Sequence, residues 1–204
     1  MTRYRVFPGG PSPLAFLSGA ALLILATDRL AHAVIAAGAL VWVYCLSSLA
    51  IYAGARILPR RNMPFLVTFL ASFMAAVFLL LLWLLSPLCA LETFFVIALV
   101  PVFCLETRIF GRLKTTGLGD TVLNALCEAL FPSALMVIFS IIREPLGCLS
   151  LSLPGGAQGI ILLFSFEKDS VLSMRIIASS SGALLLLGYS LALYRYFRRE
   201  KNGR

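Results

Sequence analysis

The sequence has few charged residues and almost no histidine. Only 13% of its 204 residues are Asp, Glu, Lys or Arg, and there is a single histidine. Soluble domains usually carry about twice that share of charged residues. The 60% of hydrophobic residues is more than a soluble fold of this length can bury. The composition therefore excludes an ordinary soluble domain and indicates an integral membrane protein.

The motifs of nucleotide-binding and hydrolytic enzymes are also missing. The sequence contains no Walker loop, no GxGxxG fingerprint, no HExxH zinc motif and no GxSxG elbow. Its five cysteines are an odd set without a CxxC pair, and most lie in apolar runs, where cysteine behaves as a small hydrophobic residue. We therefore expect neither a disulfide framework nor catalysis in water.

What the sequence has instead is six apolar runs, at residues 13–27, 34–55, 65–86, 93–105, 121–142 and 174–197. They predict an all-α integral membrane protein with six transmembrane segments in a single domain, residues 1–204. The first and fourth runs reach only about 20 to 24 Å, less than the roughly 30 Å hydrocarbon core, which predicts half-helices. Arg3 and Arg5 before the first run also fit a signal peptide, but the five further runs favour a retained segment.

The six segments divide into two similar halves, at about residues 12–86 and 90–197. Each half opens with a short run, and the long helix that follows ends in an arginine, Arg56 in the first half and Arg143 in the second. Three segments in each half give the halves opposite orientations. The pattern predicts an inverted repeat of 3+3 segments, an architecture that places ions or cofactors near the midplane of the bilayer.

Basic residues sort to one side of the predicted bundle. If both termini are cytoplasmic, only four of the 17 basic residues lie outside: Arg29, Arg143, Lys168 and Arg175. By the positive-inside rule this distribution predicts cytoplasmic termini. The basic residues stand at the ends of apolar runs, so the net charge of +8 favours lipid headgroups over nucleic acid as the partner.

Glu128 is a carboxylate inside the fifth predicted segment. An ionised group there is costly and often functional, so Glu128 is a candidate for an ion path. The alternative is that it faces water in a crevice near the end of its helix. Asp28 and His32 follow the first run, where we expect residues that cap a helix or extend towards the membrane interface.

Arg143 and Glu144 stand before Pro145, which predicts the end of the fifth helix and an anchor at the interface. Residues 150–173, with their Pro and Gly, predict an external loop near the interface.

Cys104 follows Pro101 at the end of the short fourth run, where the helix is expected to break. A thiolate at that depth could hold copper, zinc or the iron of an iron–sulfur cluster. The alternative is that the cysteine packs in the core, as most buried cysteines do.

Five stretches resemble one family of membrane subunits: 12–27 (SPLAFLSGAALLILAT), 69–77 (FLASFMAAV), 97–104 (IALVPVFC), 119–147 (GDTVLNALCEALFPSALMVIFSIIREPLG) and 182–193 (GALLLLGYSLAL). The most specific pieces are IREPLG and GALLLLG. On these stretches the chain resembles, nearly end to end, the E subunit of the Rnf ion-translocating oxidoreductase and the D subunit of Na⁺-translocating NADH:quinone reductase.

The resemblance implies a membrane subunit of an electron transport complex rather than an enzyme on its own. Such a complex couples electron transfer between ferredoxin and NAD to Na⁺ or H⁺ translocation across the bacterial inner membrane. The implied partners are an inverted sister, the Rnf A subunit, and the other subunits of the complex.

The resemblance also implies a [2Fe–2S] cluster shared with the sister subunit, with one cysteine from each half-helix as a ligand. Cys104 falls on the second of these positions. The first position is occupied by Ala21, which cannot bind iron. Three functions remain open: an electron relay, a structural subunit without an intact cluster site, and a stand-alone secondary ion transporter that uses Glu128.

Overall fold

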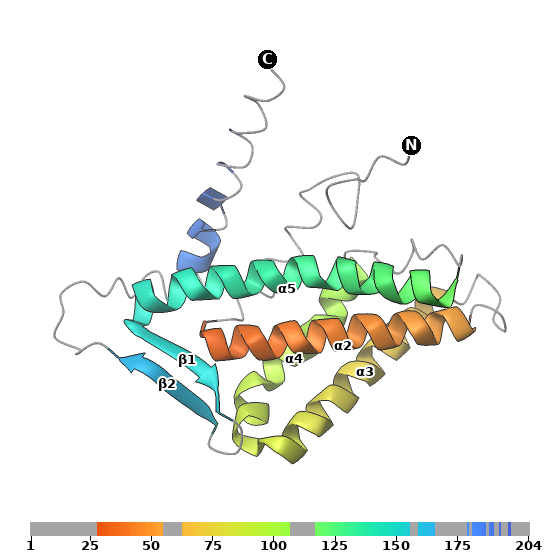
Figure 1. The fold of residues 1–204 in the computed structure, drawn as a ribbon, viewed down its shortest axis with the longest axis horizontal. Helices are drawn as coiled ribbons and strands as arrows, with labels where there is room; N and C mark the ends of the chain where they lie inside the picture. The colour runs from red at the N-terminus through yellow and green to blue at the C-terminus, as the bar shows by residue number, and fades with distance from the viewer. Residues whose placement is uncertain are drawn as a thin grey trace.

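The computed structural model describes residues 28–54, 63–106, 117–155, 159–165, 179, 181–186, 188, 189, 192 and 196. Four long helices and a two-stranded hairpin follow one another along these ranges (Figure 1). The helices are α2 (Leu30–Gly54), α3 (Met63–Leu85), α4 (Pro87–Glu106) and α5 (Leu118–Cys148), and the strands are β1 (Ser150–Pro154) and β2 (Ile160–Ser165).

All four helices are long and apolar enough to cross a membrane. They contain 25, 23, 20 and 31 residues, which correspond to about 30 to 46 Å of helix. They match the second to fifth predicted runs, so the chain is a transmembrane protein with a helical fold. The first predicted run lies outside the described residues. In the sixth run, the described residues 181–186, 188, 189, 192 and 196 are helical.

The fourth segment is not the short half-helix that we predicted. Helix α4 begins at Pro87, six residues before the predicted start at residue 93, and continues through Pro101 to Glu106. Proline suits the first position of a helix, because its missing N–H would have no helical partner there and its φ is already helical. The resulting 20-residue helix spans about 30 Å, the full hydrocarbon thickness.

Helix α5 is also longer than predicted. Instead of ending before Pro145 it passes through both Pro132 and Pro145 and ends at Cys148. Leu149 then adopts the left-handed conformation, with φ of 51°, and its N–H donates to the Pro145 carbonyl at 3.2 Å. Transmembrane helices tolerate proline because neighbouring groups satisfy the carbonyl that each proline leaves unpaired. The interpretation of residues 143–144 as the end of the helix is therefore wrong by more than a turn.

Helices α2 and α5 lie side by side and run in opposite directions (Figure 1). Leu30 at the start of α2 bonds to Glu144 near the end of α5, and Ala37 further along α2 bonds to Ser133. Only Ser86 separates α3 from α4, and these two helices pack together and against α2. Helix α2 is therefore the central element of the described bundle.

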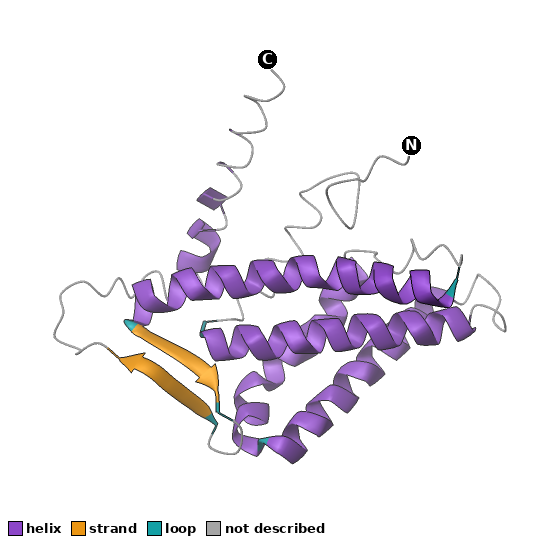
Figure 2. Ribbon diagram, in the orientation of Figure 1, coloured by secondary structure: helices purple, strands orange, loops and turns teal. Residues whose placement is uncertain are grey.

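The hairpin lies where α2 begins and α5 ends (Figure 2). Its strands are antiparallel, with Leu151 opposite Phe164 and Pro154 opposite Ile160. Gly159 closes the turn with φ of 82°, a conformation that glycine adopts without strain. Residues 150–165 were predicted to be part of a loop. The alternation Ser-Leu-Ser-Leu at the start of this range is the strand signal in the sequence.

Candidate functional site

Several charged residues gather at the end of the bundle where α2 begins. Six side chains from the start of α2, from α4, from α5 and from β1 meet there. We call this cluster the polar junction: Asp28, His32, Glu92, Arg143, Glu144 and Ser152.

The junction caps the start of α2. The first N–H groups of any helix lack helical acceptors, and the helix dipole favours a negative charge near them. The Leu30 N–H donates to Oε2 of Glu144 at 2.7 Å, and the Ala31 N–H donates to Oγ of Ser152 at 3.5 Å. The caps therefore come from α5 and β1, more than 100 residues away in the sequence.

Two charged side chains of the junction are almost completely buried. Glu144 is 1% exposed and Arg143 is 2% exposed. A buried charge is costly unless it is paired and hydrogen-bonded. Glu144 is partly satisfied, because Oε2 accepts the Leu30 N–H while Oε1 has no hydrogen-bond partner in the described part of the chain. Arg143 lies close enough to Asp28 for their charges to interact.

His32 lies between two carboxylates. Its Nδ1 is 2.6 Å from Oδ1 of Asp28, and its Nε2 is 3.8 Å from Oε2 of Glu92. The hydrogen bond from His32 is the main cause that lowers the pKa of Asp28 below its ordinary value, against the opposing effect of burial. The side chains of Asp28 and Glu92 are about half exposed, whereas that of His32 is only 12% exposed.

This arrangement places an imidazole between two carboxylates, Asp28 and Glu92, that reach the surface. Imidazole and carboxylate groups can each bind or release a proton. Within the described ranges, no three Cys, His, Asp or Glu side chains are grouped so that they could hold a metal ion.

Cys104, the predicted iron ligand, lies away from the junction. It follows Glu92 by 12 residues on the continuous helix α4, a separation of about 18 Å along the axis. Its side chain is completely buried in the apolar core of this chain. A cluster shared between subunits needs a thiolate at the subunit surface. Ala21, the other predicted position, lies outside the described residues, so the assignment of Cys104 as an iron ligand stays a prediction.

Glu128, the predicted ion-path residue, lies half-buried on α5. It precedes Glu144 by 16 residues, which places it about 24 Å away along the helix axis. It takes part in an interaction of its own. The structure therefore places Glu128 apart from the polar junction.

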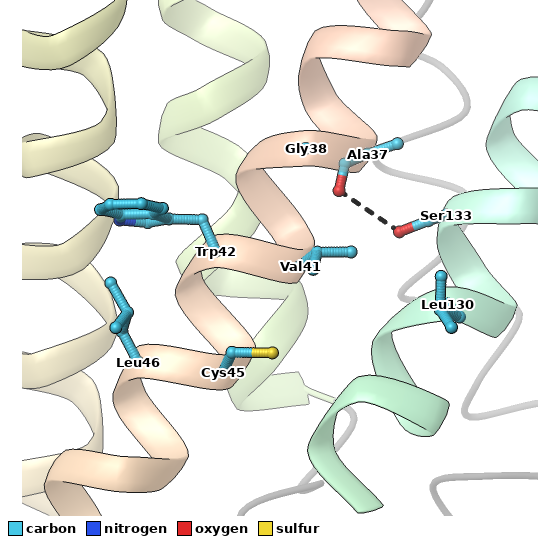
Figure 3. Close-up of a pocket in the computed structure, with 8 residues that line it drawn as sticks. All are labelled: Ala37, Gly38, Val41, Trp42, Cys45, Leu46, Leu130 and Ser133. Carbon is cyan, nitrogen blue, oxygen red and sulfur yellow. Dashed lines mark hydrogen bonds between the residues drawn. The ribbon is translucent and has the colours of Figure 1, made fainter. Parts of the chain in front are cut away.

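A groove of about 530 Å³ is lined by residues of α2 and α5 (Figure 3). Its lining is mostly apolar: Ala37, Gly38, Val41, Trp42, Cys45, Leu46, Leu130 and Ser133. The thiol of Cys45 points towards α5, and Oγ of Ser133 donates to the Ala37 carbonyl at 3.4 Å. The groove can hold an apolar chain, but it brings together no pair of acidic and basic side chains.

The polar junction could not be recognised as a unit from the sequence. The spacing of Asp28 and His32, four residues apart as on one helix face, was a signal that could have paired them. Nothing local marks Glu92 or Ser152 as partners of the start of α2. No protein-family model matches this sequence, and no curated protein matches it significantly.

Proposed function

We propose that this chain is a membrane subunit of an Rnf-type electron transport complex, which couples electron transfer between ferredoxin and NAD to Na⁺ or H⁺ translocation. The main support is the antiparallel packing of α2 and α5. These are the second helices of the two predicted halves, and an inverted repeat requires corresponding helices to run in opposite directions. The most specific family-like stretch, IREPLG, forms the end of α5.

The ends of α2 and α5 also support the proposed orientation. Arg29 precedes α2 and Arg143 lies near the end of α5, so both stand at the same end of the pair. The charge distribution assigns both arginines to the external side. We infer cytoplasmic termini in a bacterial inner membrane.

Co-purification tests the proposed assembly. The tagged chain is expressed together with the other subunits of a bacterial Rnf complex and solubilised in mild detergent. The expected result is recovery of the A subunit and the other Rnf subunits with the tagged chain, whereas an unrelated tagged multi-pass protein recovers none. The proposal fails if the chain is recovered alone while the other subunits assemble without it. Ion transport by the lone chain in proteoliposomes, abolished by Glu128→Gln, would instead favour a secondary transporter.

The enclosure of Cys104 favours a second candidate within the same complex. In this version the chain is a structural subunit that keeps the fold and partner surface but supplies no iron ligand. The support is that Cys104 has no exposed surface on an unbroken helix. Electron relay through a shared [2Fe–2S] cluster is the competing role.

The iron content of the purified pair of A subunit and this chain separates the two roles. If the chain is structural, Cys104→Ser leaves the bound iron and the paramagnetic resonance signal of the reduced pair unchanged. Ala21→Cys is then also without effect on bound iron. Loss of iron in Cys104→Ser, or a large gain of iron in Ala21→Cys, would favour the electron relay over the structural role.

A further inference from the structure

The hydrogen bond between Asp28 and His32 determines which ring nitrogen of His32 carries the proton. An ionised carboxylate only accepts hydrogen bonds, so Nδ1 of His32 must donate to Asp28 across the 2.6 Å separation. In the neutral imidazole, Nε2 then carries a lone pair. That lone pair faces the carboxylate of Glu92, which explains why Nε2 and Oε2 stay 3.8 Å apart and why buried Nε2 has no hydrogen-bond partner among the described residues.

The described charged groups around His32 come from several elements. Besides Asp28 and Glu92, they are Arg29, which precedes α2, and Arg143 and Glu144 on α5. Helix α3 has no ionisable side chain, and the described residues of β1 and β2 have none either. Asp28 and Glu92 are the two carboxylates within 4 Å of the His32 ring nitrogens among the described residues.

We propose that Asp28, His32 and Glu92 form a proton-binding site in which uptake of a proton at Nε2 ties α2 to α4. A hydronium ion from the adjacent water gives its proton to the lone pair of Nε2, so that one O–H bond breaks, one N–H bond forms and a water molecule is left. The imidazolium then donates from both nitrogens, to Asp28 before α2 and to Glu92 on α4. This role is independent of the electron transport function, since it needs only the geometry of the junction.

The single histidine of the sequence makes the site directly observable. The full chain is labelled with ¹⁵N-histidine and ¹³Cδ-glutamate and studied in lipid bilayers by solid-state NMR. At pH 8 we expect the proton on Nδ1 and a weak dipolar coupling between Nε2 and glutamate Cδ. At pH 5 we expect both nitrogens protonated and a stronger coupling, because a charged hydrogen bond brings Nε2 and the Glu92 oxygen to about 2.8 Å.

Two variants and one control assign the partners. Glu92→Gln removes the coupling that appears at pH 5, whereas Glu106→Gln, the same change on the same helix, leaves it intact. Asp28→Asn allows Nε2 to carry the proton at pH 8. Because Asp28 and Glu92 are half exposed, both variants keep the fold. A proton on Nε2 of the unmodified chain at pH 8 overturns the proposal, and so does a coupling at pH 5 that survives Glu92→Gln.

Discussion

The polar junction and the core around Cys104 each include one residue of helix α4, Glu92 and Cys104, but they differ in what surrounds a buried side chain. At the junction, buried Glu144 bonds to the start of α2, and the nearby His32 contacts Asp28 and Glu92. Cys104 is equally buried, but in the apolar core. The difference shows that a buried charge needs partners from other elements, whereas a buried thiol can be an ordinary core residue.

Glu144→Ala tests the junction and should have the largest effect. It removes the acceptor for the Leu30 N–H, leaves a cavity and removes a buried negative charge near Arg143. We expect the free energy of unfolding to fall by about 3 kcal/mol, measured by denaturant titration in detergent micelles. Glu144→Gln keeps an acceptor oxygen, so its free energy of unfolding should fall by clearly less. Equal losses in the two variants would show that the hydrogen bond to Leu30 contributes little.

Cys104→Ser tests the other side of the comparison. Serine replaces the thiol with a more polar hydroxyl in the apolar core, so we expect a loss of about 1.5 kcal/mol in the same titration. Cys127 is exposed on α5, and Cys127→Ser should change stability by less than about 0.5 kcal/mol. Equal stability of the two serine variants would contradict the core role of Cys104.

Ser152→Ala measures the cap that the hairpin gives to α2. The Ala31 N–H loses its acceptor, and removal of such a cap costs about 1 kcal/mol. Hydrogen exchange of the Ala31 amide should accelerate accordingly. Ser150→Ala, two residues earlier on the same strand, provides the matched control and should leave this exchange rate unchanged. An unchanged exchange rate of the Ala31 amide in Ser152→Ala would show that the hairpin does not cap the start of α2.

The existence of four helices could be predicted from the sequence because the bilayer requires long apolar segments. Their ends could not, since the fourth run was taken to begin only at residue 93 and Pro145 was treated as a break. Proline starts a helix as readily as it stops one, and the surrounding structure decides between the two. The hairpin had a readable signal in its alternating serine and leucine, but its Pro and Gly content pointed to a loop.

The candidate site was less predictable than the fold. Glu144 and Leu30 are separated by 114 positions, and Ser152 and Ala31 by 121. No local pattern specifies such a pairing, because it depends on the antiparallel packing of α2 and α5. The functional hypotheses from the sequence concerned single residues within apolar runs instead, namely Cys104 and Glu128. The assignment of Glu128 to an ion path stays a prediction.

Asp28→Asn should have the smallest effect, because this side chain is 54% exposed. At pH 5 we expect a loss of about 0.5 kcal/mol, as for exposed ion pairs. The pKa of Asp28 is lower in the folded chain than its ordinary value of 3.8. The stabilisation is therefore fully present above the unfolded-state pKa and is lost as the pH falls through the lower folded-state pKa. The melting temperatures of the unmodified chain and of Asp28→Asn should therefore converge as the pH is lowered from 5 to 3. A gap that widens towards pH 3 would mean that the folded state favours the protonated form of Asp28, contrary to its hydrogen bond with His32.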